Sequence, residues 1–265
     1  LHEWTAAPIN LLLLGKSVSA RDARSVGAFE VNIVPTWSVL GSDVGFTNGD
    51  VGFTTLEPAL GTGRIAASTN VQVLGYLAKI VDYESATREQ WMKNVMHFGG
   101  GSNTGEQSLF KKNLKEYEDI IEGVSFGGKV HTFLKESSDP LQINLSDSVT
   151  KLINDGVSLL CFFGHANGTN FDQSIDDPEN YNNTGRYGFV LANACLIGNI
   201  HTTGTSSGSE KFVLTPDKGS IGFLGSSSLG VPSYLHRYST SFYESLSTNH
   251  YGKSVGELMR QVIIE

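Results

Sequence analysis

Short runs of apolar residues without polar alternation recur along the chain, and such runs are typical of strands that are covered on both faces. The clearest examples lie at residues 157–163 and 187–193, where most side chains are apolar. The run at residues 31–35 ends in Pro35, which would close a short strand. We therefore expect strands at residues 11–14, 31–35, 91–98, 130–134, 157–163, 187–193 and 220–224.

Between these runs, apolar residues recur at the spacing of amphipathic helices, as Val73, Leu77 and Ile80 do within residues 71–84. Glycine-rich segments separate the elements. Residues 41–57 and 99–108 are expected to form loops, and residues 61–64 a turn. The expected helices span residues 71–84, 108–121, 145–155, 210–214, 232–246 and 256–264.

The alternation of strands and helices predicts an α/β fold, with a mainly parallel sheet sandwiched between helices. In such sheets the functional groups gather at the carboxyl ends of the strands. The residues that follow each strand are therefore the first candidates for chemistry.

Composition narrows the class of protein. The chain has 265 residues, enough for a single domain over residues 1–265 or for two parts, 1–90 and 91–265. A net charge of −8 without a Lys/Arg cluster excludes a nucleic-acid partner. The longest apolar stretch near the start, residues 9–14, is too short for membrane insertion. The sequence opens with neither a methionine nor a leader, so we expect a fragment of a longer protein.

Two consecutive strands end in candidate groups, Gly164-His165 after the first and Ala194-Cys195 after the second. If these strands are parallel neighbours, an imidazole and a thiol emerge side by side. A cysteine is a strong nucleophile only as a thiolate, and an adjacent histidine acts as base or stabilises the ion pair. The N–H groups of Cys195 and Ala166 would then point into the same pocket and stabilise an oxyanion.

Each of the two residues also has a plainer interpretation. A histidine at the end of a strand is often a structural or solvated side chain. A cysteine in an apolar run is often a small buried hydrophobic residue. The sequence alone leaves these alternatives open.

Other polar residues are weaker candidates. Acids in loops that offer the oxygen ligands of a calcium site are Asp43, Asp50, Asp172, Asp176, Asp177 and Glu179. Asp176 and Asp177 are the first candidates among them for a metal site, although the alternative that all six are solvated surface acids is favoured. Ser226, Ser227 and Ser228 follow the strand at 220–224, where a substrate-binding wall would lie. A hydrolase that uses Ser226 is a third interpretation, although the Gly-x-Ser-x-Gly pattern is missing.

Three segments together resemble the catalytic region of the gingipain-like cysteine peptidases, clan CD, peptidase family C25. They read "VSLLCFFGHANGTNF", "YGFVLANACLIGN" and "EKFVLTPDKGSIGFLGSSSLGVPSYLHRYSTSFYESL". Upstream, "NIVPTWSVLGSD" and "PALGTGRIAASTNVQVLGYLAKIVDYE" are similar to the N-terminal half of the same family. The resemblance covers residues 9–262.

The resemblance implies a caspase-like three-layer sandwich, in which helices cover both faces of a mainly parallel sheet. It implies a cysteine endopeptidase with Cys195 as nucleophile and His165 as general base and acid, acting on polypeptides without a required cofactor. The family includes secreted Arg- and Lys-specific endopeptidases of Bacteroidetes and the sortase-like peptidase of the type IX secretion system. It therefore also implies a secreted or cell-surface protein, with secretion-system components as partners.

Two positions depart from the family pattern. Ala166 stands where the family usually has a glycine after the histidine. The carboxylate that commonly lies five residues ahead of the arginine of the Gly-Arg turn is replaced by Ala59, so we expect Glu57 to act as the orienting acid. These departures keep an alternative open, in which a weak or inactive peptidase-like module binds peptides in secretion or surface attachment.

Overall fold

The structure, a computed structural model, describes residues 8–25, 27–48, 57–141, 147–175, 177–204 and 206–264. Its strands are β1 (Asn10–Leu14), β2 (Gly61–Ile65), β3 (Asn94–Gly99), β4 (Lys129–Leu134), β5 (Leu159–Phe163), β6 (Gly188–Asn193) and β7 (Ser220–Gly225). Its helices are α1 (Ala28–Val31), α2 (Asn70–Ser85), α3 (Thr104–Ile121), α4 (Asp147–Asp155), α5 (Gly208–Leu214), α6 (Pro232–Glu244) and α7 (Val255–Ile264). Within these residues, no helix has the length and apolar character needed to cross a membrane.

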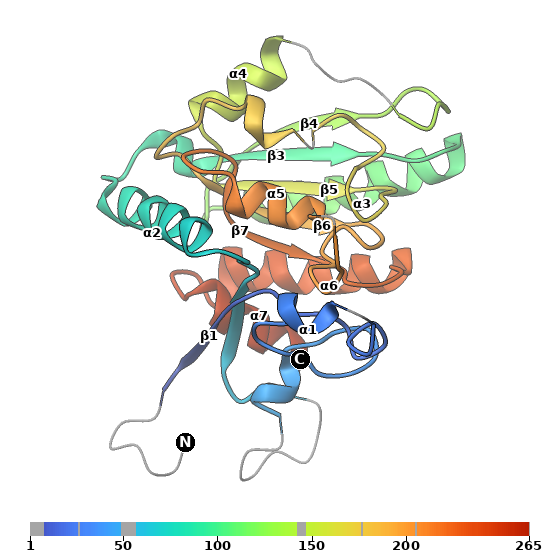
Figure 1. Ribbon diagram of the computed structural model, residues 1–265. Coiled ribbons are helices and arrows are strands. Elements are labelled where there is room, and N and C mark those ends of the chain that lie inside the picture. Colours follow the sequence, from blue (N-terminus) through green and yellow to red (C-terminus); the bar gives the residue numbers. More distant parts are fainter. Residues whose placement is uncertain are drawn as a thin grey trace.

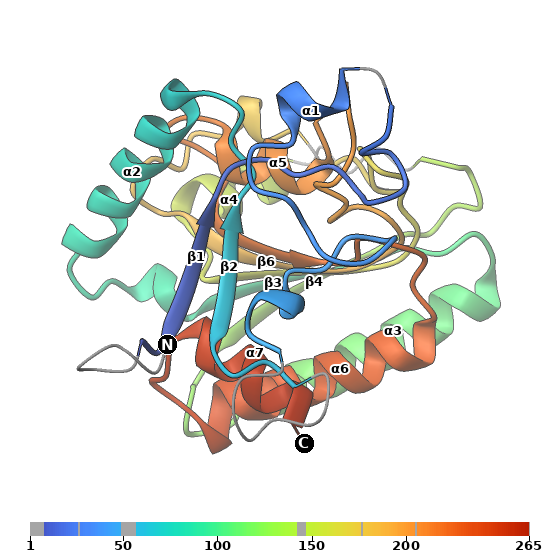
Figure 2. The ribbon, with the colours of Figure 1, turned by 60° about the horizontal axis from the view of Figure 1, so that its bottom comes forward.

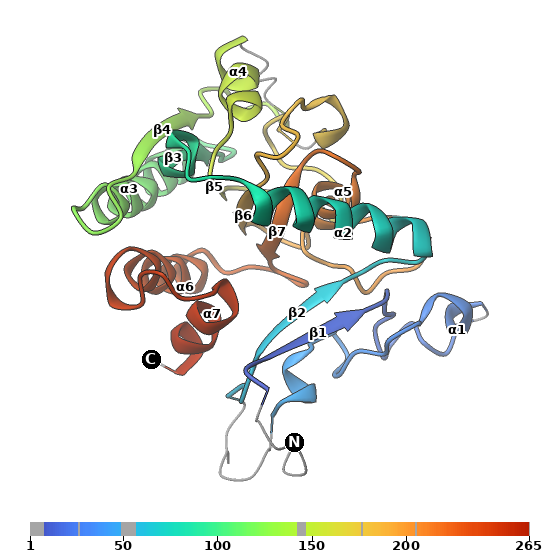
Figure 3. The same cartoon turned by 90° about the vertical axis from the view of Figure 1, so that its left-hand side faces the viewer.

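A five-stranded sheet forms the centre of the molecule, in the order β4-β3-β5-β6-β7. Every pairing in it is parallel. Figures 1 and 3 show α3, α6 and α7 on one face of the sheet and α2, α4 and α5 on the other. The α/β fold expected from the sequence, a mainly parallel sheet between two layers of helices, is confirmed.

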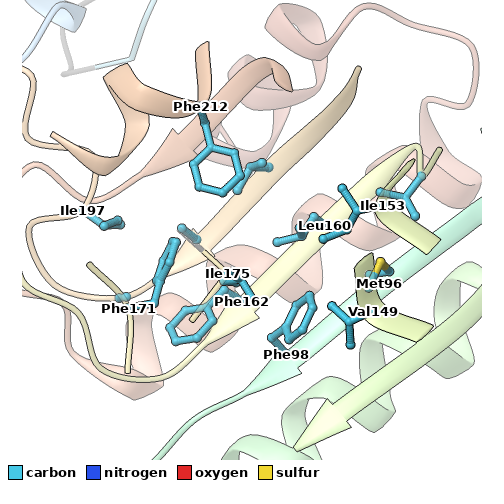
Figure 4. Packing of buried hydrophobic residues seen from close by; sticks show 14 residues of the cluster. Met96, Phe98, Val149, Ile153, Leu160, Phe162, Phe171, Ile175, Ile197 and Phe212 are labelled. Carbon is cyan, nitrogen blue, oxygen red and sulfur yellow. The ribbon is translucent and has the colours of Figure 1, made fainter. Parts of the chain in front are cut away.

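Alternate residues of the central strands face opposite helical layers. On β5, Leu160 and Phe162 join an apolar cluster with Val149 of α4 and Phe212 of α5. Figure 4 shows these side chains packed between the sheet and the two helices. This cluster closes one face of the sheet.

The intervening residues of β5 face the other layer. Leu159, Cys161 and Phe163 pack in a second cluster with Tyr117 of α3 and Phe242 of α6. All five are almost completely buried. A residue two positions beyond Phe163 continues the same alternation, so its side chain projects toward α3 and α6.

A separate two-stranded parallel sheet, β1 and β2, lies near α7 (Figure 2) and next to β7 (Figure 3). The turn expected at residues 61–64 is wrong, because this segment forms β2 and pairs with β1. Its glycines lower the intrinsic preference for a strand and so concealed it. Packing explains Gly61: a Cβ there would lie 2.7 Å from the backbone of Gly256 on α7.

The strand expected at residues 31–35 is also wrong. Val31 ends α1, and the N–H groups of Ile33 and Val34 then both donate to the carbonyl of Lys16, at 2.9 and 3.2 Å. Arg64 donates to the carbonyl of Val34 at 2.7 Å. The apolar run is therefore folded around the end of β1 instead of entering a sheet.

The two sheets divide along the chain near residue 90. Both strands of the smaller sheet precede that point, and the five-stranded sheet follows it. A cavity of about 700 Å³ lies between them, lined by residues of β2 and β7, among them Arg64 and Phe223. Whether residues 1–265 fold as one unit or as two parts stays a prediction.

Lys79 links the two halves through a buried charge. Its Nζ donates to the carbonyls of Val213 at 3.1 Å and Lys218 at 2.5 Å, and more weakly to those of Phe212 and Thr215, both at 3.4 Å. Most of these carbonyls lie at the C-terminal end of α5, where a helix leaves its last carbonyls without partners. Burial lowers the pKa of Lys79 to about 7.

Replacing Lys79 with methionine should lower the free energy of unfolding by about 1–3 kcal/mol, because buried carbonyls lose their donor. The pKa of Lys79 is about 7 in the folded protein, against an ordinary value of 10.5, so the unfolded state binds more protons between these values. The contribution of this lysine to stability therefore rises with pH over that range. Urea unfolding should show that the deficit of the variant grows from about pH 7 to about pH 9. A deficit that shrinks over this range contradicts the assignment.

Candidate active site

His165 and Cys195 leave neighbouring strands at the same level. β5 and β6 pair in parallel, and their last matched residues are Phe163 and Asn193. His165 lies two positions past the first of these, and Cys195 two positions past the second. The Gly164 N–H still donates to the Asn193 carbonyl at 3.2 Å, so the pairing continues almost to the point where both chains enter their loops.

The alternation along the two strands directs both side chains toward the α3 and α6 layer. The His165 ring lies edge-on to Phe110 of α3, with 6.3 Å between the ring centroids. The Cys195 sulfur contacts Gly230, shortly before α6: the Gly230 N–H donates to Sγ at 3.4 Å, and the thiol reaches the Gly230 carbonyl at 3.9 Å. The His165 side chain remains 48% exposed, so it is accessible from solvent.

A carboxylate holds the His165 ring. Nε2 of His165 lies 2.9 Å from Oε2 of Glu106, in the first turn of α3. The Ser102 N–H donates to the same oxygen at 2.8 Å, and the Asn103 side chain caps the helix by accepting the Glu106 N–H at 3.0 Å. The hydrogen bond from His165, followed by that from Ser102, holds the pKa of Glu106 below its ordinary value. Glu106 thus engages Nε2, and Nδ1 is the other nitrogen of the ring.

The carboxylate that contacts His165 is therefore Glu106, whereas the sequence predicted Glu57 as the orienting acid. Glu57 precedes β2, which begins at Gly61, and is followed by Pro58, whose carbonyl accepts a hydrogen bond from Arg260 of α7. Within the described residues, nothing joins Glu57 to His165. The loop expected at residues 99–108 is wrong in its second half, because α3 begins at Thr104 and carries Glu106.

A local signal for Glu106 was present in the sequence. Asn103 is followed three residues later by Glu106, and this spacing before an apolar run is a signature of a helix start. Recognising it would have placed a carboxylate at the N-terminus of a helix that follows a strand of the sheet. It would not have shown that this strand, β3, is the neighbour of β5.

The N–H groups of Ala166 and Cys195, the expected oxyanion donors, have no hydrogen-bond acceptor in the part of the chain that the structure describes. Ala166 forms a bridge with Phe171, but the two hydrogen bonds of this bridge come from the flanking residues. Ala166 is not among the residues with positive φ, so its methyl group adds no backbone strain. The alanine in place of glycine therefore leaves the N–H able to donate.

The turn after Cys195 is strained. Leu196 has a φ of 60°, which is uncommon for a residue other than glycine. Its N–H donates to the Ser228 carbonyl at 2.9 Å, and the Gly198 N–H donates to the Ser226 carbonyl at 3.0 Å. A positive φ in a residue such as leucine persists only where surrounding contacts stabilise it, and such residues are often found at active sites. Nothing in the sequence indicated this feature.

Ser226, Ser227 and Ser228 thus lie against the Cys195 turn. The Ser226 hydroxyl donates to the Ser228 carbonyl at 2.8 Å and accepts the Ser228 N–H at 3.2 Å. These local bonds occupy the hydroxyl and disfavour Ser226 as a nucleophile. Ser227 donates to the Gly41 carbonyl at 3.4 Å and lines the cavity between β2 and β7. A substrate-binding role for the three serines stays a prediction.

The second cysteine has a contrasting environment. Cys161 is fully buried, and burial raises the pKa of its thiol to about 12. Cys161 is therefore a protonated core residue at neutral pH. Cys195 is only partly buried.

The acids proposed for calcium are only partly covered by the structure. Among the described residues, no cluster of three or more Asp, Glu, His or Cys side chains is arranged to hold a metal ion. Asp177 accepts a hydrogen bond from the Asn180 side chain, and Asp172 pairs with Lys135 at 3.3 Å. Asp50 and Asp176 lie outside the described residues, so the calcium site stays a prediction.

Comparison with known proteins assigns the family. The model of peptidase family C25 matches residues 1–265. The chain belongs to peptidase family C25. No curated protein matches it.

Solved structures show the same fold for this C25 chain. It superposes on the crystal structure of the Arg-specific cysteine proteinase gingipain R (RgpB) with a TM-score of 0.73 and 12% identity, over 96% of this chain and 57% of that one. The complex of the Porphyromonas gingivalis RgpB pro- and mature domains gives 0.73 and 12%, over 99% and 60%. A further protease structure gives 0.71 and 17%, over 96% and 57%. These matches confirm the caspase-like fold, and the C25 chain spans 57–60% of the length of the solved chains.

The choice between the two acids can be tested directly. Glu106→Gln should slow the reaction of Cys195 with iodoacetamide, and any peptide hydrolysis, by about 10- to 100-fold, because the histidine loses the carboxylate that orients it. Glu57→Gln is the matched control and should react like the wild type. Equal effects of the two substitutions, or a larger effect of Glu57→Gln, would contradict the assignment of Glu106 rather than Glu57 as the orienting acid.

Proposed function

We propose that this C25 chain is a cysteine endopeptidase in which Cys195 is the nucleophile, His165 the general base and acid, and Glu106 the orienting carboxylate. The observation that carries the proposal is the equal level at which β5 and β6 end, with the His165 ring already held by Glu106. Membership of family C25 supports a peptidase acting on polypeptides.

The proposed reaction follows from the positions of the groups. His165 Nδ1 takes the thiol proton, and the Cys195 thiolate attacks the scissile carbonyl carbon. The carbonyl oxygen becomes an oxyanion, which accepts hydrogen bonds from the backbone N–H groups of Ala166 and Cys195. His165 returns the proton to the leaving amine as the C–N bond breaks, which leaves a thioester on Cys195. Water, deprotonated by His165, hydrolyses the thioester and regenerates the thiol. Glu106 stabilises the imidazolium that forms twice in this cycle.

The proposal extends to the place of action. Gingipain-like peptidases are exported, and on that resemblance the substrates are exported or surface proteins, the enzyme is secreted or surface-bound, and components of a secretion system are its partners. Detection of the protein in medium and envelope fractions of the source cells supports this extension. Its confinement to the cytosolic fraction refutes it.

Cleavage of a peptide library, mapped by mass spectrometry, tests the activity. The wild type should cut, Cys195→Ser and His165→Ala should not, and Ser226→Ala should cut like the wild type. Loss of cleavage in Ser226→Ala alone would favour the serine hydrolase interpretation. Binding of peptides without any cleavage would favour the inactive module.

The rate at which Cys195 is alkylated tests whether Cys195 and His165 form a reactive pair. In a Cys161→Ser background, Cys195 should react rapidly with iodoacetamide near neutral pH, and His165→Ala should slow it by about tenfold or more. The buried Cys161, with a pKa raised to about 12, should stay unmodified in the folded wild type. A Cys195 rate that is independent of His165 would contradict the assigned pair.

A further inference from the structure

A buried carboxylate lies directly behind the loop that carries His165. Asp172 is 6% exposed, and its Oδ2 accepts the Gly101 N–H at 2.9 Å and pairs with Nζ of Lys135 at 3.3 Å. The Lys135 side chain is itself only 1% exposed. Oδ1 of Asp172 is buried without a partner in the described part of the chain. Removing the Asp172 carboxylate from water costs free energy, so its burial at this place needs an explanation.

The hydrogen bonds of Asp172 complete a closed ring of contacts in the candidate active site, which joins Asp172, Gly101, Ser102, Glu106 and His165 and is called the circuit below. Its N–H donates to the His165 carbonyl at 2.9 Å, and its carboxylate accepts the Gly101 N–H at 2.9 Å. Ser102, which follows Gly101, donates its N–H to the Glu106 carboxylate at 2.8 Å. Glu106 in turn holds the His165 ring at 2.9 Å. The backbone and the ring of the same histidine are thus connected to Glu106 by two routes.

Glycines make room for this circuit. A Cβ on Gly100 would lie 2.2 Å from Oδ1 of Asp172, and one on Gly164 would lie 2.9 Å from it. Gly101 has a φ of 121°, a backbone conformation that residues other than glycine rarely adopt. The chain on both sides of the carboxylate is therefore shaped to admit it.

We infer that Asp172 is a positioning residue for the proposed reaction: by binding the Gly101 N–H and the His165 loop together, it sets the place of Glu106 relative to the His165 ring. The inference rests on the proposed function, because it assigns a role in the same site. The bonds of Asp172 to this site go to the His165 carbonyl and the Gly101 N–H, both backbone groups, so it acts through Glu106.

The physical reason lies in the exposure of the pair it supports. The side chains of His165 and Glu106 are 48% and 36% exposed, and such an exposed contact is weak because ordering two mobile side chains offsets most of its attraction. Fixing the backbone on both sides removes part of that entropy before the two side chains meet. The buried Asp172–Lys135 pair supplies a rigid point to which both backbones are attached.

A matched pair of variants isolates the hydrogen bond from the charge. The double variant Lys135→Met/Asp172→Asn, called the Asn variant, removes both charges but keeps a side-chain oxygen that can accept the Gly101 N–H. The double variant Lys135→Met/Asp172→Leu, called the Leu variant, has a side chain of nearly the same shape as the Asn variant at position 172 but no hydrogen-bond acceptor. Because the two charges leave together, neither variant buries an unpaired ion, and both should fold.

The Leu variant should lose about 10- to 100-fold in kcat with little change in KM, and the Asn variant should stay close to the wild type. In a Glu106→Gln background, the two variants should have equal kcat, because the circuit then has nothing to position. A merely structural role would lower kcat by the same factor with or without Glu106. Such additivity, or equal activity of the two variants beside an intact Glu106, overturns the inference.

A second readout does not depend on activity, so it separates failure of this inference from failure of the proposed function. Hydrogen bonds from His165 and Ser102 lower the pKa of Glu106, so its carboxyl carbon can be followed by NMR titration. The titration midpoint of Glu106 should rise toward the ordinary value in the Leu variant and stay low in the Asn variant. If the wild type proves inactive but this difference appears, the positioning role stands and the peptidase proposal falls. Identical midpoints in the two variants overturn the inference whatever the activity.

Discussion

The parallel register between β5 and β6 is the constraint on which the rest of the structure depends. A slip of one residue would turn Phe162 away from the α5 layer and move the site side chains to the opposite face. Both faces of these strands are filled with apolar side chains, so a slip would disrupt both clusters at once. The core of the sheet thereby fixes the relative position of His165 and Cys195, although neither residue belongs to the core.

The same constraint extends to a third strand. β3 pairs with β5 so that Gly99 is level with Phe163, and the loop after β3 therefore emerges beside the His165 loop. That loop leads within a few residues into α3, whose first turn carries Glu106. Three adjacent parallel strands thus deliver the acid, the imidazole and the thiol to one edge of the sheet. This is the edge at which α/β proteins generally place their functional groups.

Much of this architecture is readable from the sequence, because the strands of the central sheet are covered on both faces and leave continuous apolar runs. The elements that carry His165 and Cys195 were predicted for that reason, and the family was recognised from the same segments. Glu106 and β2 were missed for a different reason. Both depend on partners distant in the sequence: Glu106 on the pairing of β3 with β5, and glycine-rich β2 on its pairing with β1. The positive φ of Leu196 is likewise imposed by contacts with the segment after β7 and has no local signal.

The most direct test of the central claim is to trap the acyl-enzyme. Intact-mass measurement after rapid mixing with a reactive peptide ester should show one added acyl group, and peptide mapping should place it on Cys195. The adduct should be absent in Cys195→Ser and should form slowly in His165→Ala. An adduct on Ser226 or Cys161, or none under conditions in which the ester is consumed, would contradict the account.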